Sequence, residues 1–319
     1  MFLIPTAAAL AVLARLAHGS ILEISPTYHN GSVVVERLSV DGNLDGPKIQ
    51  TSANRSSFDF CGEALATSNA VINTCSGGIA GIWGETGASF RGTDLQKANV
   101  EYDILLDMAS IGIKGNVVLK SRAPARYPCD FNVPGVNQEL LPHLSWSNAV
   151  PDAEATVNLD INGTSLSFSN GIGYHDKNWG DAPVYTKARS WDWGHARFGP
   201  YSVVWFDILD RTNTERFHAF VAKDGNPVLL SCADSILQVR QWGGDAAYPP
   251  VSGLGHVDGL TARFTLEDGQ VLVANVTTDL LIENLGGGIF TRAIGSVKGG
   301  VVGQEIFEGR AMYDENIFG

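Results

Sequence analysis

The sequence has few cysteines, few methionines and few basic residues, and each shortage narrows what the chain can do. Its 319 residues include 4 Cys, 3 Met and 22 Lys or Arg against 34 Asp or Glu, which gives a formal net charge of −12. Nucleic acids are bound through clustered Lys and Arg. Because the basic residues are scattered, the sequence predicts no nucleic-acid partner, and the acidic balance chiefly favours solubility.

The motifs of several enzyme classes are also missing. There is no GxSxG elbow, no HExxH helix, no Walker loop and no glycine-rich dinucleotide fingerprint after a strand. No CxxC pair or Cys/His ligand spacing occurs either, so no metal site is predicted. The even number of cysteines predicts disulfides in an oxidising compartment, with three pairings open, among Cys61, Cys75, Cys129 and Cys232.

Long apolar runs are confined to the N-terminus. Residues 1–20 predict a signal peptide, because an apolar run at 2–13 is followed by the small residues of Ala17-His18-Gly19. The alternative is a short membrane anchor, although the run is shorter than a bilayer span requires. We therefore expect a secreted or lumenal protein with no stable membrane span. Four sequons agree with this route and predict glycosylation at Asn30, Asn54, Asn162 and Asn275.

The hydrophobic pattern alternates with the period of a β-strand. No window holds a helical stripe, and 36 Gly and 13 Pro punctuate the chain as turn residues. The pattern predicts an all-β protein with little helix, built as a sandwich or barrel. The loop at 224–227 predicts a domain boundary near residue 225, between domains at 21–225 and 226–319. Alternating runs occur at 31–40, 100–106, 111–120, 157–168 and 271–282.

One hairpin can be placed in register from its turn. Asn162-Gly163 is a strong signal for a two-residue loop. The apolar residues then share one face and the polar residues the other, so the turn and the alternation agree. The predicted pairs are Ile161 with Thr164, Leu159 with Leu166, and Val157 with Phe168.

A second turn is predicted at Gly199-Pro200. A two-residue loop there sets Phe198 opposite Tyr201, Gly194 opposite Trp205, and Asp192 opposite Asp207. Like charges directly opposite each other destabilise a sheet. The Asp pair therefore requires a cation between the carboxylates, such as Lys177, or a proton on one of them.

The richest mixture of chemical groups lies at 171–181. If the strand stays extended, His175, Lys177 and Trp179 share one face, and Tyr174, Asp176 and Asn178 share the other. Four of the seven tryptophans fall between 179 and 205. A pocket that binds a flat apolar molecule and moves protons on it combines such groups. We expect Lys177, Asp207 and His175 to be catalytic, and substrate to contact Trp179, Trp193, Trp205, Asp192, Asn178 and His195.

Each of these residues also has a structural interpretation. His175 fits a structural histidine, and the tryptophans fit a hydrophobic core. His195 and Arg197 fit a structural pair with Asp192. A carboxylate at Asp207 follows the apolar run at 203–206 and is unfavourable there unless it is partnered.

The segments 175–180 and 193–197 resemble the two-domain lipocalin-like proteins related to carotenoid 1,2-hydratases, and most of all the fungal Diels–Alderase branch with its hetero-Diels–Alderases of tropolonic sesquiterpenoid biosynthesis. The resemblance runs from about residue 83 to the C-terminus. It implies two β-barrel-like domains, a deep apolar pocket and no cofactor. In the hydratase branch His-x-Trp and Tyr-x-Asp serve the chemistry. Trp179 and Asp207 match that pattern, whereas Lys177 and Trp205 depart from it.

Another departure lies near the N-terminus, where residues 58–60 pass directly to 61–63 and about thirty residues of the family pattern are missing. We interpret this as a deletion or an error in the gene model. A true deletion would leave the first domain with open sheet edges.

The resemblance and the residues together predict a pericyclase acting on an apolar polyketide or terpenoid. It would join an o-quinone-methide-like heterodiene to a terpene alkene in a hetero-Diels–Alder reaction. Lys177 or His175 would hydrogen-bond the heterodiene oxygen, Asp207 with Asp192 would assist loss of water, and the tryptophans would exclude solvent. A hydratase, dehydratase or isomerase is the first alternative, and a secreted carrier without turnover is the second.

Overall fold

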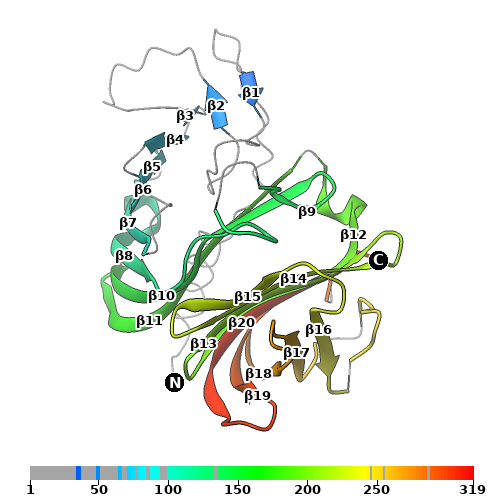
Figure 1. The fold of residues 1–319 in the computed structure, drawn as a ribbon. Coiled ribbons are helices and arrows are strands. Elements are labelled where there is room, and N and C mark those ends of the chain that lie inside the picture. Colours follow the sequence, from blue (N-terminus) through cyan, green and yellow to red (C-terminus); the bar gives the residue numbers. More distant parts are fainter. Residues whose placement is uncertain are drawn as a thin grey trace.

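A computed structural model describes residues 34–36, 48–50, 64–66, 70–75, 78–83, 87–93, 99–132, 136–180, 182–244, 246–253, 256–285 and 288–319. This part of the chain is almost entirely β, as the alternation predicts (Figure 1). Its helices are two single 3-10 turns, Ala109–Ile111 and Val184–Thr186. Neither is long enough to cross a membrane. The signal peptide at 1–20, the sequons of Asn30 and Asn54, and the junction at 58–63 lie outside the described residues.

The N-terminal half forms a curved antiparallel sheet. Its strand order is β11-β10-β8-β7-β6-β5-β4-β3, with β9 added beside β10. A separate pair, β1 (Val34–Glu36) and β2 (Lys48–Gln50), precedes it. The strands of the curved sheet are β3 (Ala64–Ala66), β4 (Ala70–Cys75), β5 (Gly78–Trp83), β6 (Ala88–Thr93), β7 (Glu101–Met108), β8 (Ile113–Ser121), β9 (Glu139–Leu141), β10 (Leu144–Ile161) and β11 (Thr164–Gly180).

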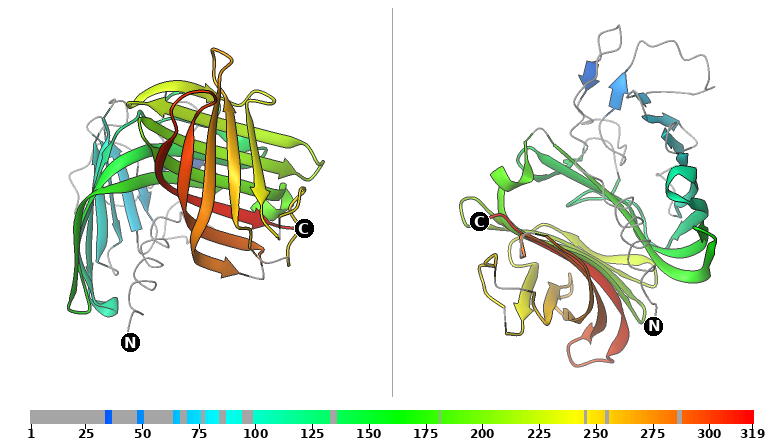
Figure 2. Two further views of the ribbon diagram at one scale, coloured as in Figure 1. Left: turned by 90° about the horizontal axis from the view of Figure 1, so that it is seen from below. Right: turned by 180° about the vertical axis from the view of Figure 1, so that it is seen from behind.

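The C-terminal half curls into a barrel around its own core (Figure 2). Its strand order is β15-β14-β13-β12-β20-β19-β18-β17-β16. The buried side chains inside it include Phe198, Trp205, Phe264 and Tyr313. The strands are β12 (Ala188–Phe198), β13 (Tyr201–Asp210), β14 (Glu215–Lys223), β15 (Asn226–Ser231), β16 (Leu237–Trp242), β17 (Gly259–Thr265), β18 (Val271–Leu285), β19 (Phe290–Val301) and β20 (Phe307–Ile317).

The chain passes from one sheet to the other between Gly180 and Ala188. The boundary expected near residue 225 falls instead in the turn between β14 and β15, inside the second sheet. The polar residues there resemble a linker, but they make a tight turn, with Asp224 and Gly225 both at positive φ. Local composition alone does not distinguish a hairpin turn from a linker.

Both hairpin registers are confirmed. β10 and β11 pair Ile161 with Thr164 and continue in the predicted order, with Asn162 and Gly163 both at positive φ, as a two-residue turn requires. β12 and β13 pair Phe198 with Tyr201. The predicted pairs Gly194–Trp205 and Asp192–Asp207 follow in that register.

The two sheets meet along a hydrophobic cluster that we call the seam. It contains Trp146 from β10, Trp193 from β12, Phe206 from β13 and Phe220 from β14, all buried. The rings of Trp146 and Phe206 touch edge to face with centroids 5.1 Å apart. The long β10–β11 pair thus lies along the outer wall of the barrel (Figure 1).

A disulfide between Cys129 and Cys232 also crosses from one half of the chain to the other. Cys129 lies in the connection between β8 and β9, and Cys232 follows β15. Of the three pairings left open by the sequence, this is the bridge that the described residues contain. It closes a loop over a sequence separation of 103 residues, and a cross-link of that reach stabilises by restricting the unfolded chain.

We predict that Gly194→Ala destabilises the barrel by about 2 kcal/mol through overpacking, because the added Cβ would lie 2.0 Å from Cζ2 of the buried Trp205. Urea unfolding followed by tryptophan fluorescence measures the change. Gly269→Ala is the control, since its Cβ would meet no atom within 4 Å and the substitution carries only the strain of φ +79°. Equal losses in the two variants would contradict the packing argument.

Candidate active site

The wall strands of the barrel carry different chemistry on their two faces. Trp205 packs into the barrel core, whereas its neighbours Val204 and Phe206 pack into the seam. Successive side chains of a strand point to opposite faces. By the same alternation Trp193 and His195 face the seam, while Asp192 and Gly194 face the barrel interior.

A chain of hydrogen bonds crosses the seam and joins both sheets. The Trp146 indole N–H and the Tyr174 hydroxyl each donate to Asp176 Oδ2 at 2.9 Å. The Trp193 indole N–H donates in turn to the Tyr174 oxygen at 3.3 Å. Trp146 is fully buried, and Tyr174 and Asp176 are half-buried.

The surroundings of Asp176 and Tyr174 favour the neutral, protonated form of each side chain. Burial raises the pKa of Asp176, and the hydrogen bonds from Trp146 and Tyr174 offset only part of that effect. Burial and the neighbouring Asp176 raise the pKa of Tyr174 well above its usual value. A carboxylic acid whose pKa is raised in this way is a candidate proton donor.

A buried arginine lies beside this chain of hydrogen bonds. The Arg126 guanidinium stacks between the rings of Trp146 and Phe220, at 4.8 and 4.6 Å from their centroids. Burial lowers its pKa to about 9, while the nearby Tyr174 and Asp176 act in the opposite direction. Among the described residues, Arg126 Nε has no hydrogen-bond partner. Cation–π contact with two rings compensates part of the desolvation of this charge.

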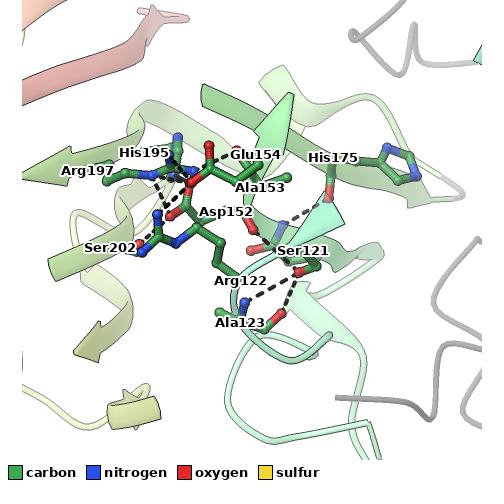
Figure 3. A network of polar contacts seen from close by, with 11 residues as sticks. Ser121, Arg122, Ala123, Asp152, Ala153, Glu154, His175, His195, Arg197 and Ser202 are labelled. Carbon is green, nitrogen blue, oxygen red and sulfur yellow. Dashed lines mark hydrogen bonds and ion pairs between the residues drawn. The ribbon is translucent and has the colours of Figure 1, made fainter. Parts of the chain in front are cut away.

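Next along the seam, the buried Asp152 of β10 holds the barrel to the first sheet (Figure 3). Arg197 binds its carboxylate through Nε at 2.8 Å and Nη2 at 2.6 Å, and Ser202 donates to it as well. His195 Nε2 lies 3.4 Å from Asp152 Oδ1, without the geometry of a hydrogen bond. Burial alone would raise the pKa of Asp152, but His195 and Arg197 outweigh it and lower the pKa to about 2.

The predicted residues of β11 divide between two faces. The His175 ring points away from the Asp152 network (Figure 3) and contacts the Tyr102 ring edge to face at 4.9 Å. Lys177, half-buried, lies opposite Ser147 of β10 and alternates with Asp176. The structure therefore does not bring His175 and Lys177 to the hydrogen-bonded chain of Tyr174 and Asp176.

Asn178 shares the face of Asp176, and its buried Oδ1 has no hydrogen-bond partner in the part of the chain that the structure describes. Of Trp179 only the backbone is described, as the strand partner of Ser145. Trp193 and His195 both lie at the seam, where the Tyr174 ring contacts each of them at a centroid distance of 5.1 Å. Trp205 is fully buried inside the barrel instead.

Asp207 and Asp192 lie inside the barrel, away from the seam. Asp207 Oδ2 accepts the Val239 backbone N–H at 2.9 Å and lies 3.2 Å from Arg240 Nη1, and both partners belong to the edge strand β16. Asp192 accepts a hydrogen bond from Gln241 of the same strand at 3.2 Å. The cation beside the Asp pair is therefore Arg240 and not Lys177. These carboxylates help to close the barrel across its open edge.

The pKa values of Asp207 and Asp192 are also raised, which reduces the repulsion between the two carboxyl groups. Burial raises the pKa of Asp207 to about 7, although Val239 and Arg240 act against it. Burial, Glu315 and Asp207 together raise the pKa of Asp192 well above its usual value. Both shifts act toward the second condition drawn from the sequence, a proton on one of the two carboxyl groups.

A third polar group gathers around the disulfide. His218 Nδ1 lies 2.9 Å from Cys232 Sγ and 3.9 Å from Cys129 Sγ. His218 Nε2 lies 3.2 Å from the Leu140 carbonyl oxygen, which accepts a hydrogen bond from the Nε2–H group. Burial lowers the pKa of His218 to about 3. No short motif links these residues, so ligand spacing in the sequence did not reveal the group.

Comparison with known proteins identifies the family of the chain. The sequence profile of the Diels–Alderase-like family matches residues 42–242. The chain belongs to this family. It is 40% identical to the quinolone epoxide rearrangement proteins penF of Penicillium thymicola and asqO of Emericella nidulans. The matches cover 79% and 80% of this chain and 69% and 68% of those proteins.

A solved structure shares the fold. The crystal structure of CghA with Sch210972 superposes with a TM-score of 0.61 at 18% identity, over 78% of this chain and 75% of that one. Diels–Alderase pyiF of Pyricularia grisea is a more distant relative, 25% identical over 53% of this chain and 40% of its own. Members of the family are enzymes that act on small molecules.

We predict that the raised pKa of Asp207 makes the protein less stable as pH rises from about 4 to about 7. In this window the folded state keeps a proton that the unfolded state has released, so unfolding becomes easier by up to about 4 kcal/mol. Urea unfolding at pH 5 and pH 8 measures the effect. Asp207→Asn removes this titration, so its stability falls less over the same range. An unchanged pH dependence in the variant would contradict the assignment.

Proposed function

We propose that the chain is a cofactor-independent isomerase of fungal secondary metabolism, which protonates and rearranges an epoxide carried by a flat aromatic heterocycle. The observation that carries the proposal is the chain of hydrogen bonds from Trp146 through Asp176 and Tyr174 to Trp193, which places an acid among aromatic rings from both sheets. The names of the two relatives at 40% identity support the reaction class.

Asp176 supplies the proton in this mechanism. Its Oδ2 accepts both hydrogen bonds, so Oδ1 is the oxygen that delivers a proton to the epoxide oxygen. Protonation breaks one C–O bond and leaves an alcohol beside a cationic carbon. A neighbouring hydrogen or carbon group then migrates, or a ring closes, and the surplus proton returns to Asp176. The atoms balance without an external reagent, because the product is an isomer of the substrate.

The rings around the acid stabilise the cationic intermediate. Trp146 and Trp193 flank Tyr174 and Asp176, and aromatic faces attract a positive charge. Arg126 shows that rings at this seam already accept a cation, since its guanidinium stacks on Trp146. Burial of the rings of Trp146 and Trp193 in the seam keeps water from the intermediate and so protects it from capture by solvent.

A hetero-Diels–Alder reaction is the second candidate, and the family's name and its Diels–Alderase members favour it. The Tyr174 hydroxyl and the Trp193 indole would then polarise a heterodiene oxygen, and the two sheets would hold diene and alkene together. The tropolonic sesquiterpenoid substrate expected from the sequence belongs to this candidate, as do catalytic roles for Lys177 and His175.

Asp176→Asn is expected to reduce turnover of an epoxide-bearing quinolone at least about 100-fold, because loss of a general acid removes that order of rate, with little change in binding. Lys177→Ala, one residue along and on the other face of β11, is the matched control and should retain activity. Rates and product ratios are compared with the spontaneous background by liquid chromatography. Loss of activity in Lys177→Ala alone would instead support the mechanism built on Lys177.

A labelled substrate distinguishes the reaction classes. With ¹⁸O in the epoxide and ordinary water as solvent, an isomerase gives a product of unchanged mass that keeps the label. A hydratase gives a product heavier by one water, and a cycloaddition requires a diene and an alkene and leaves the epoxide untouched. Tight binding without any product, retained in Asp176→Asn, would indicate a carrier. Mass spectrometry of the product makes each of these comparisons.

A further inference from the structure

The group around the disulfide has the composition of a metal centre. Cys129 Sγ, Cys232 Sγ and His218 Nδ1 all lie within 4.8 Å of one another. Two sulfurs and an imidazole nitrogen are ligands that Zn²⁺ prefers, and three protein ligands with one open position are common in zinc sites. In the oxidised chain the sulfurs are bonded to each other, so they are unable to ligate as thiolates.

We propose that reduction of this disulfide creates a Zn²⁺ site formed by Cys129, Cys232 and His218. A thiol or phosphine reductant adds two electrons and two protons to the disulfide and is itself oxidised. Zn²⁺ then replaces the two thiol protons, which are released to solvent.

The histidine is already oriented for this role. A neutral His218 that donates its Nε2–H to the Leu140 carbonyl presents the lone pair of Nδ1, the nitrogen that faces the sulfurs. Histidines that bind metals commonly donate their other N–H to a backbone carbonyl in this way. The buried ring packs edge to face on Phe206 at 6.1 Å, which holds its direction.

The distances require only a small adjustment. With Zn–S near 2.3 Å and Zn–N near 2.0 Å, a tetrahedral ion separates sulfur from nitrogen by about 3.5 Å and the two sulfurs by about 3.8 Å. The nitrogen–sulfur distances of 2.9 and 3.9 Å already bracket the first value. The Cα atoms of the two cysteines are 5.2 Å apart, so rotation of their side chains is enough to separate the two sulfurs by about 3.8 Å.

The proposed Zn²⁺ site would connect the two halves of the chain. Cys129 belongs to the first half of the chain, whereas Cys232 and His218 belong to the barrel. Cys129 is exposed and Cys232 half-buried, which gives a reductant and an ion an entry path. A bound ion would replace the covalent cross-link between the two halves, so the seam would remain held together under reducing conditions.

Co²⁺ is the spectroscopic probe for this site. The full chain is reduced with a phosphine, freed of reductant by anaerobic gel filtration and titrated with Co²⁺. We expect one equivalent to produce the thiolate charge-transfer band and the d–d bands of a tetrahedral site, and Zn²⁺ to abolish both. The oxidised chain should produce neither band.

Two cysteine variants locate the ligands. Cys129→Ser should lose the charge-transfer band, whereas Cys75→Ser, the matched control outside this group, should keep it. Equal Co²⁺ binding by reduced Cys129→Ser and the reduced parent chain would overturn the proposal. If reduction unfolds the chain, far-ultraviolet circular dichroism decides the matter. Recovery of the strand signal with one equivalent of Zn²⁺ supports the site, and no recovery contradicts it.

Discussion

The buried carboxylate of Asp152 is the interaction on which the arrangement of the two halves depends. It lies on the long strand β10 of the first sheet, and Arg197 and Ser202 of the barrel wall bind it from the other side. An unpaired charge at this depth would be strongly destabilising, so each sheet needs the other to satisfy its polar groups. The same contact sets the position of the barrel wall along β10, and with it the contact between Tyr174 and Trp193 across the seam.

Local signals in the sequence were sufficient for two of the strand pairings. Asn162-Gly163 set the register of β10 with β11, and Gly199-Pro200 set that of β12 with β13, because a two-residue turn leaves a single pairing compatible with the apolar pattern. The opposed carboxylates of Asp192 and Asp207 followed from that register. The family was also correctly identified from segments in the same strands.

The candidate site was only partly predictable, because alternation divides a strand into two faces without telling which face meets a distant partner. Lys177 and Asp176 are adjacent, and only the contact between β11 and the barrel selects Asp176 for the seam. Asp207 was correctly expected to need a partner, but that partner, Arg240, comes from the opposite edge of the sheet. Arg126 and Asp152 carry no local signal at all, since their burial arises from contacts between the two halves.

The alternation along β12 has an evolutionary consequence. From Trp191 to Phe198 its even positions, such as Ala196, face the barrel core, and its odd positions, such as Trp193 and His195, line the seam. Substitution at an odd position changes the face that meets the first sheet, while the barrel core keeps its packing. One scaffold is thereby free to diversify its chemistry by a few replacements along a single strand, and relatives with differently named reactions on one fold are the expected outcome.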